Sequence, residues 1–313
     1  MACKIYVDGQ EGTTGLRIHE YLSQRTDLEI LHIPQEQRKD LQVRQKYLNE
    51  ADLVFLCLPD QAAREAVALI ENNRTRVVDA STAHRTIWTY GFPEMNRDQR
   101  TLIAESKRVC VPGCHATGFM SLVYPLVQTG WVRPEADFSC QSLTGYSGGG
   151  KSLIQKFENY TPTEAGVPKP YALKLQHKHL PEMQAIPGLK NPPVFLPVVA
   201  GFYKGMAVSV PVTPQMSAKK LTAEDAVKFF QDYYANETFV RVMPLGAETE
   251  FADGFFDVEG CNDTNRLDIF VFGQGDHLLL MARLDNLGKG ASGAAIQNMN
   301  IMLGVSETTG LQA

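Results

Sequence analysis

One cysteine stands in a setting that suits chemical reaction. Cys114 lies in the stretch VPGCHATGF, residues 111–119, directly after a Pro-Gly turn and before small residues that begin a helix. A cysteine at a helix N-terminus has its thiolate stabilised by the helix dipole and by unbonded backbone N–H groups. The same N–H groups can hold a developing oxyanion. We therefore predict that Cys114 is a nucleophile; the alternative is a small buried or capping residue.

The other five cysteines are scattered, most of them in apolar surroundings: Cys3, Cys57, Cys110, Cys140 and Cys261. No two cysteines have C-x-x-C spacing. No second cluster supplies the ligands missing from a zinc site built on Cys110, Cys114 and His115. We predict reduced thiols and no metal, as expected of a cytoplasmic protein.

A nucleophilic thiol needs a general acid or base, and histidine is the usual choice near neutral pH. His177 and His179 lie in the segment YALKLQHKHLPEM, residues 171–183, with Glu182 close by. Histidines at positions i and i+2 do not share a helical face, which disfavours a metal pair. We predict that one of the two histidines is a base oriented by Glu182; the alternative is a surface loop with two exposed histidines.

The elements that position these residues begin with an apolar strand expected at residues 3–9. Gly9, Gly12 and Gly15 follow, then apolar residues with helical periodicity and a second strand at residues 28–33. Glycines let the backbone approach a pyrophosphate, and the helix N-terminus supplies donors. The G-x-x-G-x-x-G spacing is weak alone. Its place between the first strand and the first helix predicts a dinucleotide site rather than a plain turn.

The choice of cofactor depends on the segment PQEQRKD, residues 34–40, after the second strand. It contains Glu36, an acidic residue of the kind that binds the ribose of NAD, but also Arg38 and Lys39. Cations at this place suit the 2′-phosphate of NADP. We predict NADP, with Arg38 as a contact; a solvated loop is the alternative.

Strands and helices continue to alternate in the first part of the chain. Further strands are expected at residues 51–59, 76–81 and 107–113, and helices at 63–73 and 115–129. This order predicts a doubly wound parallel sheet, in which ligands bind at the carboxyl ends of the strands. Residues 81–85 and Cys114 follow strand ends, so we expect them on the cofactor side. A thiolate beside a nicotinamide suggests attack on an acyl carbon and reduction of the thioester to an aldehyde.

Beyond residue 135 the pattern predicts an α+β domain with an antiparallel or mixed sheet. We expect a strand at the start of 139–152, two strands within 194–213, a helix at 223–236 and a hairpin at 267–286. A final helix at 289–304, rich in small residues, could pack back on the first domain. The segment GYSGGGKS, residues 145–152, fits the spacing of an ATP-binding loop. It comes late and lacks a partner strand of the ATPase type, so we favour a substrate-side loop.

Length and charge exclude several classes of protein. The chain has 313 residues, enough for two domains, and a formal net charge of −5. A negative net charge does not indicate the basic surface that binds nucleic acid. No apolar run approaches the roughly 20 residues that span a bilayer, and the first residues do not read as a secretory signal. We expect a cytoplasmic protein that binds neither nucleic acid nor membranes.

Three segments together resemble the N-acetyl-γ-glutamyl-phosphate reductase family, the NADP-dependent enzymes of arginine biosynthesis. They are VPGCHATGF, HKHLPEM (residues 177–183) and DNLGKGASGAAIQNMNIMLG (residues 285–304), the last being the most specific. The resemblance runs from the glycine loop to the C-terminal helix and is to the family's shorter branch. The first loop, GQEGTTG, departs from many members, which have an Ala-Ser pair after the first glycine.

The resemblance implies a Rossmann domain and a second domain similar to that of glyceraldehyde-3-phosphate dehydrogenase. We expect the first over residues 1–117 plus 287–313 and the second over 118–286. The implied reaction converts N-acetyl-γ-glutamyl phosphate and NADPH into N-acetylglutamate 5-semialdehyde, NADP⁺ and phosphate. Members of the family are dimers or tetramers, so a homo-oligomer is expected.

Carried over by position, the resemblance makes Cys114 the nucleophile and His179 the favoured acid/base, with His177 still open. Cofactor contacts are expected at Gly9, Gly12, Thr13, Thr14, Gly15, Arg38 and Ser81, and on the nicotinamide side at Gly290, Ser292 and Asn298. Arg85 and Lys151 are candidates for contacts with the substrate's phosphate or carboxylate. The alternatives are a related reductase of aspartyl or aminoadipyl phosphate, and a non-catalytic dinucleotide sensor.

Overall fold

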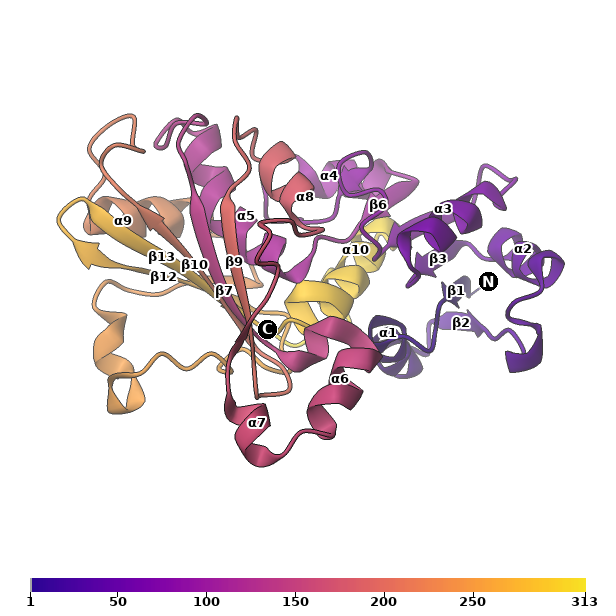
Figure 1. Ribbon diagram of the computed structural model, residues 1–313. Helices are drawn as coiled ribbons and strands as arrows, with labels where there is room; N and C mark the ends of the chain where they lie inside the picture. The colour runs from indigo at the N-terminus through magenta and orange to yellow at the C-terminus, as the bar shows by residue number, and fades with distance from the viewer. Residues whose placement is uncertain (1) are drawn as a thin grey trace. The chain divides into compact units, whose positions relative to one another are not determined.

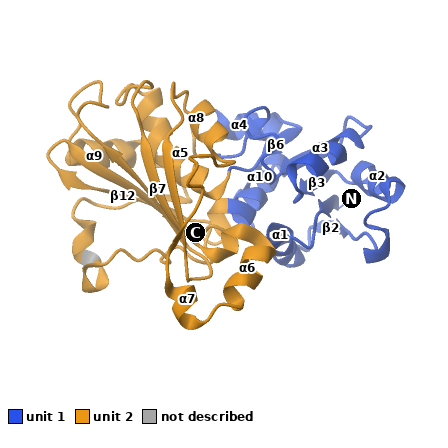
Figure 2. Cartoon of the chain, in the orientation of Figure 1, with its two compact units in different colours: residues 1–93, 98–112, 291–311 blue, residues 94–97, 113–290, 312–313 orange. Residues whose placement is uncertain are grey.

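The computed structural model describes residues 2–313, apart from the side chain of residue 250. The chain forms two compact units (Figure 2). Unit 1 contains residues 1–93, 98–112 and 291–311, and unit 2 contains residues 94–97, 113–290 and 312–313. The chain therefore passes between the two main parts of the units at 112/113 and at 290/291. The sequence analysis expected these domain boundaries at 117/118 and 286/287. Cys114 itself belongs to unit 2.

The described part of unit 1 forms the predicted parallel sheet (Figure 1). Six strands pair in the order β2-β1-β3-β4-β6-β5, every pair parallel. The strands are β1 (Cys3–Asp8), β2 (Leu28–Leu31), β3 (Leu53–Leu56), β4 (Arg76–Asp79), β5 (Thr89–Tyr90) and β6 (Arg108–Cys110). The strand order reverses at β1, between its neighbours β2 and β3, which is where such sheets bind their ligands.

Helices cover both faces of this sheet, which is why its strands are continuously apolar. On one face α1 (Thr13–Ser23), α4 (Gln99–Glu105) and α10 (Gly293–Leu303) pack on Ile5 and Val7. On the other face α2 (Leu41–Glu50) and α3 (Asp60–Ala68) pack on Tyr6. The C-terminal helix therefore returns to the first unit, as its small residues suggested.

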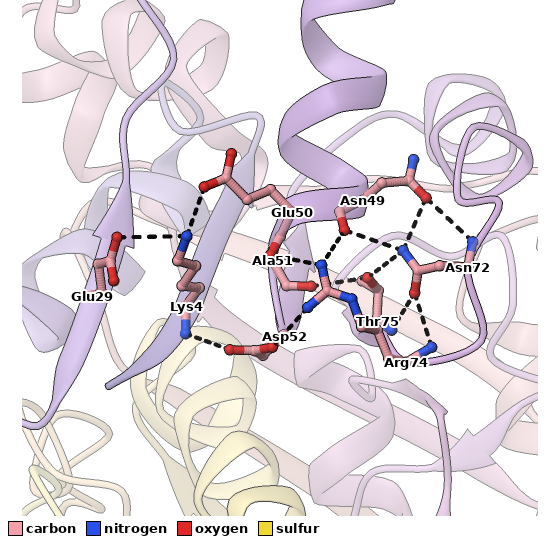
Figure 3. Close-up of polar contacts among 9 residues, drawn as sticks. All are labelled: Lys4, Glu29, Asn49, Glu50, Ala51, Asp52, Asn72, Arg74 and Thr75. Carbon is pink, nitrogen blue, oxygen red and sulfur yellow. Dashed lines mark hydrogen bonds and ion pairs between the residues drawn. The ribbon is translucent and has the colours of Figure 1, made fainter. Parts of the chain in front are cut away.

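Polar contacts close the amino ends of these strands (Figure 3). The Asp52 carboxylate accepts a hydrogen bond from the Lys4 N–H at 2.9 Å and pairs with Arg74 at 3.2 Å. The Asn72 amide donates to Asn49 Oδ1 at 2.9 Å. These bonds tie the start of β1 to the segments that lead into β3 and β4. The opposite, carboxyl ends of the strands are the ones available to a ligand.

Unit 2 contains a mixed sheet, seven strands in its described part, in the order β11-β12-β13-β10-β7-β9-β8. The strands are β7 (Ser139–Gly145), β8 (Lys169–Pro170), β9 (Val194–Ala200), β10 (Met206–Val212), β11 (Val240–Val242), β12 (Leu267–Gln274) and β13 (His277–Leu284). The hairpin expected at 267–286 is β12 and β13. The two strands expected within 194–213 are present, but β7 lies between them, parallel to β9 and antiparallel to β10.

Helix α5 (Cys114–Gln128) packs on β10 and β13, and α9 (Ala223–Tyr233) packs on β12. The strand residues that point away from these helices include Val194 and Leu196 of β9 and Leu279 of β13, all exposed. The helices therefore cover one face of the sheet. The other face is open at β9 and at Leu279 of β13, and covered at β12, where Phe251 and Phe256 pack on Phe270. The helices expected at 115–129 and 223–236 are confirmed, with Pro125 inside α5.

Short elements were missed by the sequence analysis because they carry no long apolar period. They include the helices α6 (Gly150–Glu158), α7 (Pro162–Gly166) and α8 (Leu180–Ala185), and the 3-10 turns η1 (Gln35–Gln37), η2 (Tyr146–Gly149), η3 (Ala247–Glu250) and η4 (Ala252–Gly254). The helices α2 and α4 and the strands β5, β8 and β11 were not predicted either. The expected C-terminal helix also begins differently, with a π-helical turn, η5 (Gly288–Ser292), before α10. None of the helices formed by the described residues is both long and apolar enough to cross a membrane.

Helix α5 approaches β10 so closely that only glycine fits at position 118. A Cβ at Gly118 would lie 2.5 Å from Val208 Cγ2. We expect Gly118→Ala to lower the free energy of unfolding by about 1–3 kcal/mol through overpacking, although alanine favours a helix. Urea unfolding measures this, with Gly166→Ala as the control because no heavy atom lies within 4 Å of its Cβ position. Equal stability of Gly118→Ala and the native chain would contradict the packing.

Candidate active site

Cys114 is the first residue of α5 and is half-buried. The preceding residue, Gly113, is the N-cap and offers the helix no side chain. Its own N–H donates to Glu182 Oε2 at 3.2 Å, and the Glu182 side chain is buried. The sequence analysis expected Glu182 to orient a histidine. In the structure its carboxylate binds the backbone N–H at the start of α5.

Gly290 lies against the cysteine from the other side. A Cβ at Gly290 would lie 2.8 Å from Cys114 Cβ and 3.3 Å from Cys114 Cα. The Gly290 N–H donates to the Asp285 carbonyl at 2.9 Å, which fixes the turn. The sequence analysis expected Gly290 beside the nicotinamide. Within unit 2 it contacts Cys114, and this contact requires glycine because a Cβ would lie too close to the cysteine.

Two histidines gather at Cys114. Ligand-type atoms of Cys114, His115 and His179 all lie within 4.8 Å of one another. His179 is buried and precedes α8, whereas His177 is half-buried. His177 Nδ1 accepts a hydrogen bond from the His179 N–H at 3.2 Å, and the two rings lie 4.7 Å apart. The structure therefore brings His179 to the thiol, while His177 bonds the backbone of His179.

His115 is a site residue that the sequence analysis considered only as a zinc ligand. Its Nδ1 lies 2.7 Å from Ser142 Oγ and its Nε2 lies 2.9 Å from Tyr171 Oη. Burial, with a smaller contribution from the nearby charges of His177 and Lys178, lowers the pKa of His115 to about 3. A neutral imidazole donates at one nitrogen and accepts at the other, which both hydroxyls can match. Binding a metal here would break one of these bonds, so we assign none.

Tyr171 connects this cluster to the thiol. Burial raises the pKa of its hydroxyl, and the nearby Cys114 raises it further. A neutral phenol can donate a hydrogen bond within the cluster. Ser142 and Tyr171 are separated from His115 by 27 and 56 positions in the chain. Only the adjacency of His115 to Cys114 could have pointed to this cluster from sequence.

Unit 1 holds a cavity of about 490 Å³ at the carboxyl ends of β1 and β3. Its lining includes Gly9, Gly12, Cys57 and the cations discussed below. Gly9 has φ +90°, and a Cβ there would lie 2.3 Å from the Cys57 carbonyl oxygen. The nearby Thr13 Oγ1, in the first turn of α1, is buried with no hydrogen-bond partner among the described residues. A close glycine backbone and an unused hydroxyl at a helix N-terminus fit a pyrophosphate.

Three cations line the same cavity, and two of them are paired. Arg38 pairs with Glu11, and Arg44 pairs with Asp8 at 2.7 Å. Lys39 has no carboxylate partner in the part of the chain that the structure describes. Cations at this end of the cavity suit a phosphate; a contact of Arg38 with the 2′-phosphate remains a prediction.

Other residues expected to contact the cofactor make bonds within unit 1. Ser81 Oγ donates to Asp79 Oδ2 at 2.8 Å. Ser292 Oγ donates to the Thr14 carbonyl at 3.2 Å, and so ties the start of α10 to the first turn of α1, which also contains Gly15. Asn298 Nδ2 donates to the Gly91 carbonyl at 2.9 Å. These bonds support the glycine loop and the strand ends; direct contacts by these residues remain predictions.

The two residues predicted to contact the substrate lie in different units. Arg85, in unit 1, is buried, and its guanidinium donates to the carbonyls of Val111 at 2.9 Å and Ala80 at 3.3 Å. Lys151, in unit 2, is exposed at the second position of α6. The loop before it follows β7 of the mixed sheet, not a strand of the parallel sheet, which argues against an ATP-binding loop.

Family models match both parts of the chain. Residues 4–103 match "Semialdehyde dehydrogenase, NAD binding domain" and residues 114–286 match "Semialdehyde dehydrogenase, dimerisation domain". Among solved structures, the fold is similar to aspartate semialdehyde dehydrogenase II of Vibrio cholerae, with a TM-score of 0.71 and 13% identity over 97% of this chain and 98% of that one. It is also similar to the enzyme of Francisella tularensis, with a TM-score of 0.72 and 14% identity over 96% and 100%.

Curated relatives are much closer in sequence. The chain is 45% identical to N-acetyl-gamma-glutamyl-phosphate reductase 2 of Nostoc sp., over 98% of this chain and 99% of that protein. It is 41% identical to the protein of the same name in Pseudomonas putida, over 98% of both. With this identity over nearly its whole length, the chain belongs to the family of N-acetyl-γ-glutamyl-phosphate reductases.

Proposed function

We propose that this protein is an NADPH-dependent reductase that converts N-acetyl-γ-glutamyl phosphate into N-acetyl-L-glutamate 5-semialdehyde and phosphate. The observation that carries the proposal is Cys114 at the start of α5, within 4.8 Å of a ring nitrogen of His179, in a chain of this family. The reaction belongs to arginine biosynthesis. We place it in the cytoplasm; the six cysteines all lie within the described residues and are free thiols, which suits a reducing compartment.

Cys114 acts as the nucleophile. Its thiolate attacks the acyl carbon of the substrate, the bond from that carbon to the phosphate oxygen breaks, and inorganic phosphate leaves. Backbone N–H groups at the start of α5 face the charge that develops on the carbonyl oxygen. Bound NADPH supplies a hydride to this chemistry. Cys114 is released as a thiolate when the acyl carbon has been reduced to the aldehyde.

His179 is the acid/base of the pair, and His177 a support for its backbone. The proximity of His179 to Cys114 allows it to take the thiol proton, and a histidine can return a proton near neutral pH. His177 uses Nδ1 to accept from the His179 N–H. Glu182 holds Gly113, so we assign it to the start of α5.

The cofactor is NADP, bound by the glycine loop of unit 1. Gly9, Gly12 and the first turn of α1, with Thr13, Thr14 and Gly15, face the pyrophosphate. Arg38 and Lys39 face the 2′-phosphate. The fit rests on the closeness of Gly9 to Cys57 and on the unused Thr13 hydroxyl.

The reverse reaction tests the activity directly. Enzyme, N-acetylglutamate 5-semialdehyde, phosphate and NADP⁺ should give a phosphate-dependent rise in NADPH absorbance. Cys114→Ala should abolish the rise while still binding NADP⁺, because the thioester cannot form. His179→Asn should lower kcat by about 10²–10⁴-fold, and His177→Asn by less. Cys3→Ala, in unit 1, serves as the control.

The same assay separates the rival functions. A rise with aspartate semialdehyde but not with the N-acetylglutamate aldehyde would keep the chemistry and change the substrate. No rise with either of these or with the aminoadipate aldehyde, despite NADP⁺ binding, would favour a dinucleotide sensor. Residual turnover in Cys114→Ala would contradict the thioester mechanism.

Arg38 and Lys39 provide a test of the cofactor that needs no turnover. We expect the double variant Arg38→Gln/Lys39→Gln to bind 2′,5′-ADP about 10- to 100-fold more weakly, the effect of losing a charged hydrogen bond. Binding of 5′-ADP should change little, because it lacks the 2′-phosphate. Lys46→Gln, in α2 and outside the cavity lining, is the matched control. Isothermal calorimetry measures both ligands, and equal weakening of the two would refute the assignment.

We also propose a homodimer formed through the open face of the unit 2 sheet, with a tetramer as a pair of such dimers. The face presents Val194 (45% exposed), Leu196 (48%) and Leu279 (36%). These residues lie within the segment that matches the dimerisation-domain model. Large apolar side chains exposed on the open part of a sheet are typical of an interface.

A charge on this face should therefore separate the subunits. We expect Leu196→Glu to shift the protein to a monomer in sedimentation velocity, because the carboxylate would be buried without a partner. Leu102→Glu is the control, since Leu102 is 51% exposed on α4 of unit 1. A Leu196→Glu protein that remains as associated as the control would move the interface elsewhere.

A further inference from the structure

Unit 2 contains an ion pair that is withdrawn from solvent. Lys289 Nζ lies 2.7 Å from Glu94 Oε1, and both side chains are 0% exposed. The ammonium group also lies 5.6 Å from the centre of the Phe239 ring. Desolvating two charges is so costly that apolar residues of similar volume often stabilise a protein equally well. Stability alone therefore does not account for this pair.

Lys289 immediately precedes Gly290, the residue that packs on Cys114. Both lie in the π-helical turn η5, and such turns are rare and frequent at functional sites. A Cβ at Gly290 would lie 2.8 Å from Cys114 Cβ, so the backbone of this turn packs directly against the cysteine. A small displacement of this turn would change the space in which the thiol rotates.

The approach to the turn is fixed by Asp285. Its Oδ1 accepts from the Leu287 N–H at 2.8 Å, and its carbonyl accepts from the Gly290 N–H at 2.9 Å. These bonds define the path of the backbone into η5. Lys289 is the long side chain that ties this turn to a segment almost 200 positions earlier in the sequence.

The segment that carries Glu94 is itself attached to α5. Asn96 Nδ2 donates to Tyr124 Oη at 3.2 Å, and Tyr124 lies in the helix that Cys114 begins. Glu94 therefore lies in a segment bonded to the same rigid helix as the thiol. The ion pair connects this helix to the turn that presses on Cys114.

We propose that Glu94 and Lys289 are positioning residues for Cys114. Their ion pair holds the Gly290 backbone against the cysteine and so sets the direction in which the thiolate meets the acyl carbon. This inference rests on the proposed role of Cys114 as the nucleophile. Both charged side chains are fully buried, so we expect their loss to change the rate of thiol chemistry and to leave ligand binding unchanged.

The experiment uses the double variant Glu94→Gln/Lys289→Met in the full-length protein. Removing both charges avoids a buried charge without a partner. We expect kcat of the reverse reaction to fall at least tenfold, with KM for the aldehyde and Kd for NADP⁺ within twofold of the native values. The alkylation rate of Cys114 by iodoacetamide, followed by peptide mass spectrometry, should change at least threefold. The control is Arg100→Met/Glu307→Gln, which removes a unit 1 ion pair of 3.1 Å.

A folded double variant with native kcat and a native alkylation rate would overturn the proposal. If the double variant does not fold, Gly290→Ala tests the same contact with the ion pair intact. It should lower kcat and change Cys114 alkylation, whereas native values for both would overturn the proposal. Alkylation needs no substrate, so it tests the positioning even if the native enzyme does not act on this aldehyde.

Discussion

The close approach of the Gly290 backbone to Cys114 is the constraint on which the arrangement of unit 2 depends. A helix that starts with its functional residue has no preceding turn to hold that residue, so other segments must do so. Glu182 bonds the N–H of Gly113, and Gly290 fills the space beside the Cys114 Cβ. Gly118 lets the same helix lie directly on β10. The thiol is thus fixed by its surroundings on several sides.

In each unit, buried polar groups fix the position of the backbone and add little net charge. His115 is neutral because burial lowers its pKa to about 3, so it presents two hydrogen bonds and no charge at neutral pH. The Asp79 carboxylate of unit 1 bonds both Ser81 and His84 Nδ1, at 2.8 and 2.6 Å, and shapes the turn after β4. A buried polar group with all its hydrogen-bond partners stabilises one backbone arrangement over the alternatives. That property suits segments that must present a ligand-binding or reacting atom in one place.

Local patterns were enough to predict much of this protein. The glycine loop, the parallel sheet and the helix beginning at the cysteine follow from spacing within 15 to 30 residues. The pairing of His179 with Cys114 was expected, but from the family resemblance. The Ser142–His115–Tyr171 bonds and the Glu94–Lys289 pair join residues far apart in sequence, and no periodicity relates such partners. Ser292 and Asn298 were predicted from their motif, yet their bonds to Thr14 and Gly91 depend on how α10 packs.

The three histidines His115, His177 and His179 cannot exchange roles, because their hydrogen bonds differ. His115 has hydroxyl partners at both ring nitrogens, and its pKa is too low for the ring to take up a second proton near pH 7. His177 accepts an N–H at Nδ1, which requires that nitrogen to be unprotonated and restricts its proton to Nε2. His179 lies beside Cys114, with its backbone held by His177. The sequence alone left His177 and His179 open, and it is this hydrogen bond between them, with the nearness of His179 to the thiol, that favours His179 as the group that exchanges a proton with Cys114.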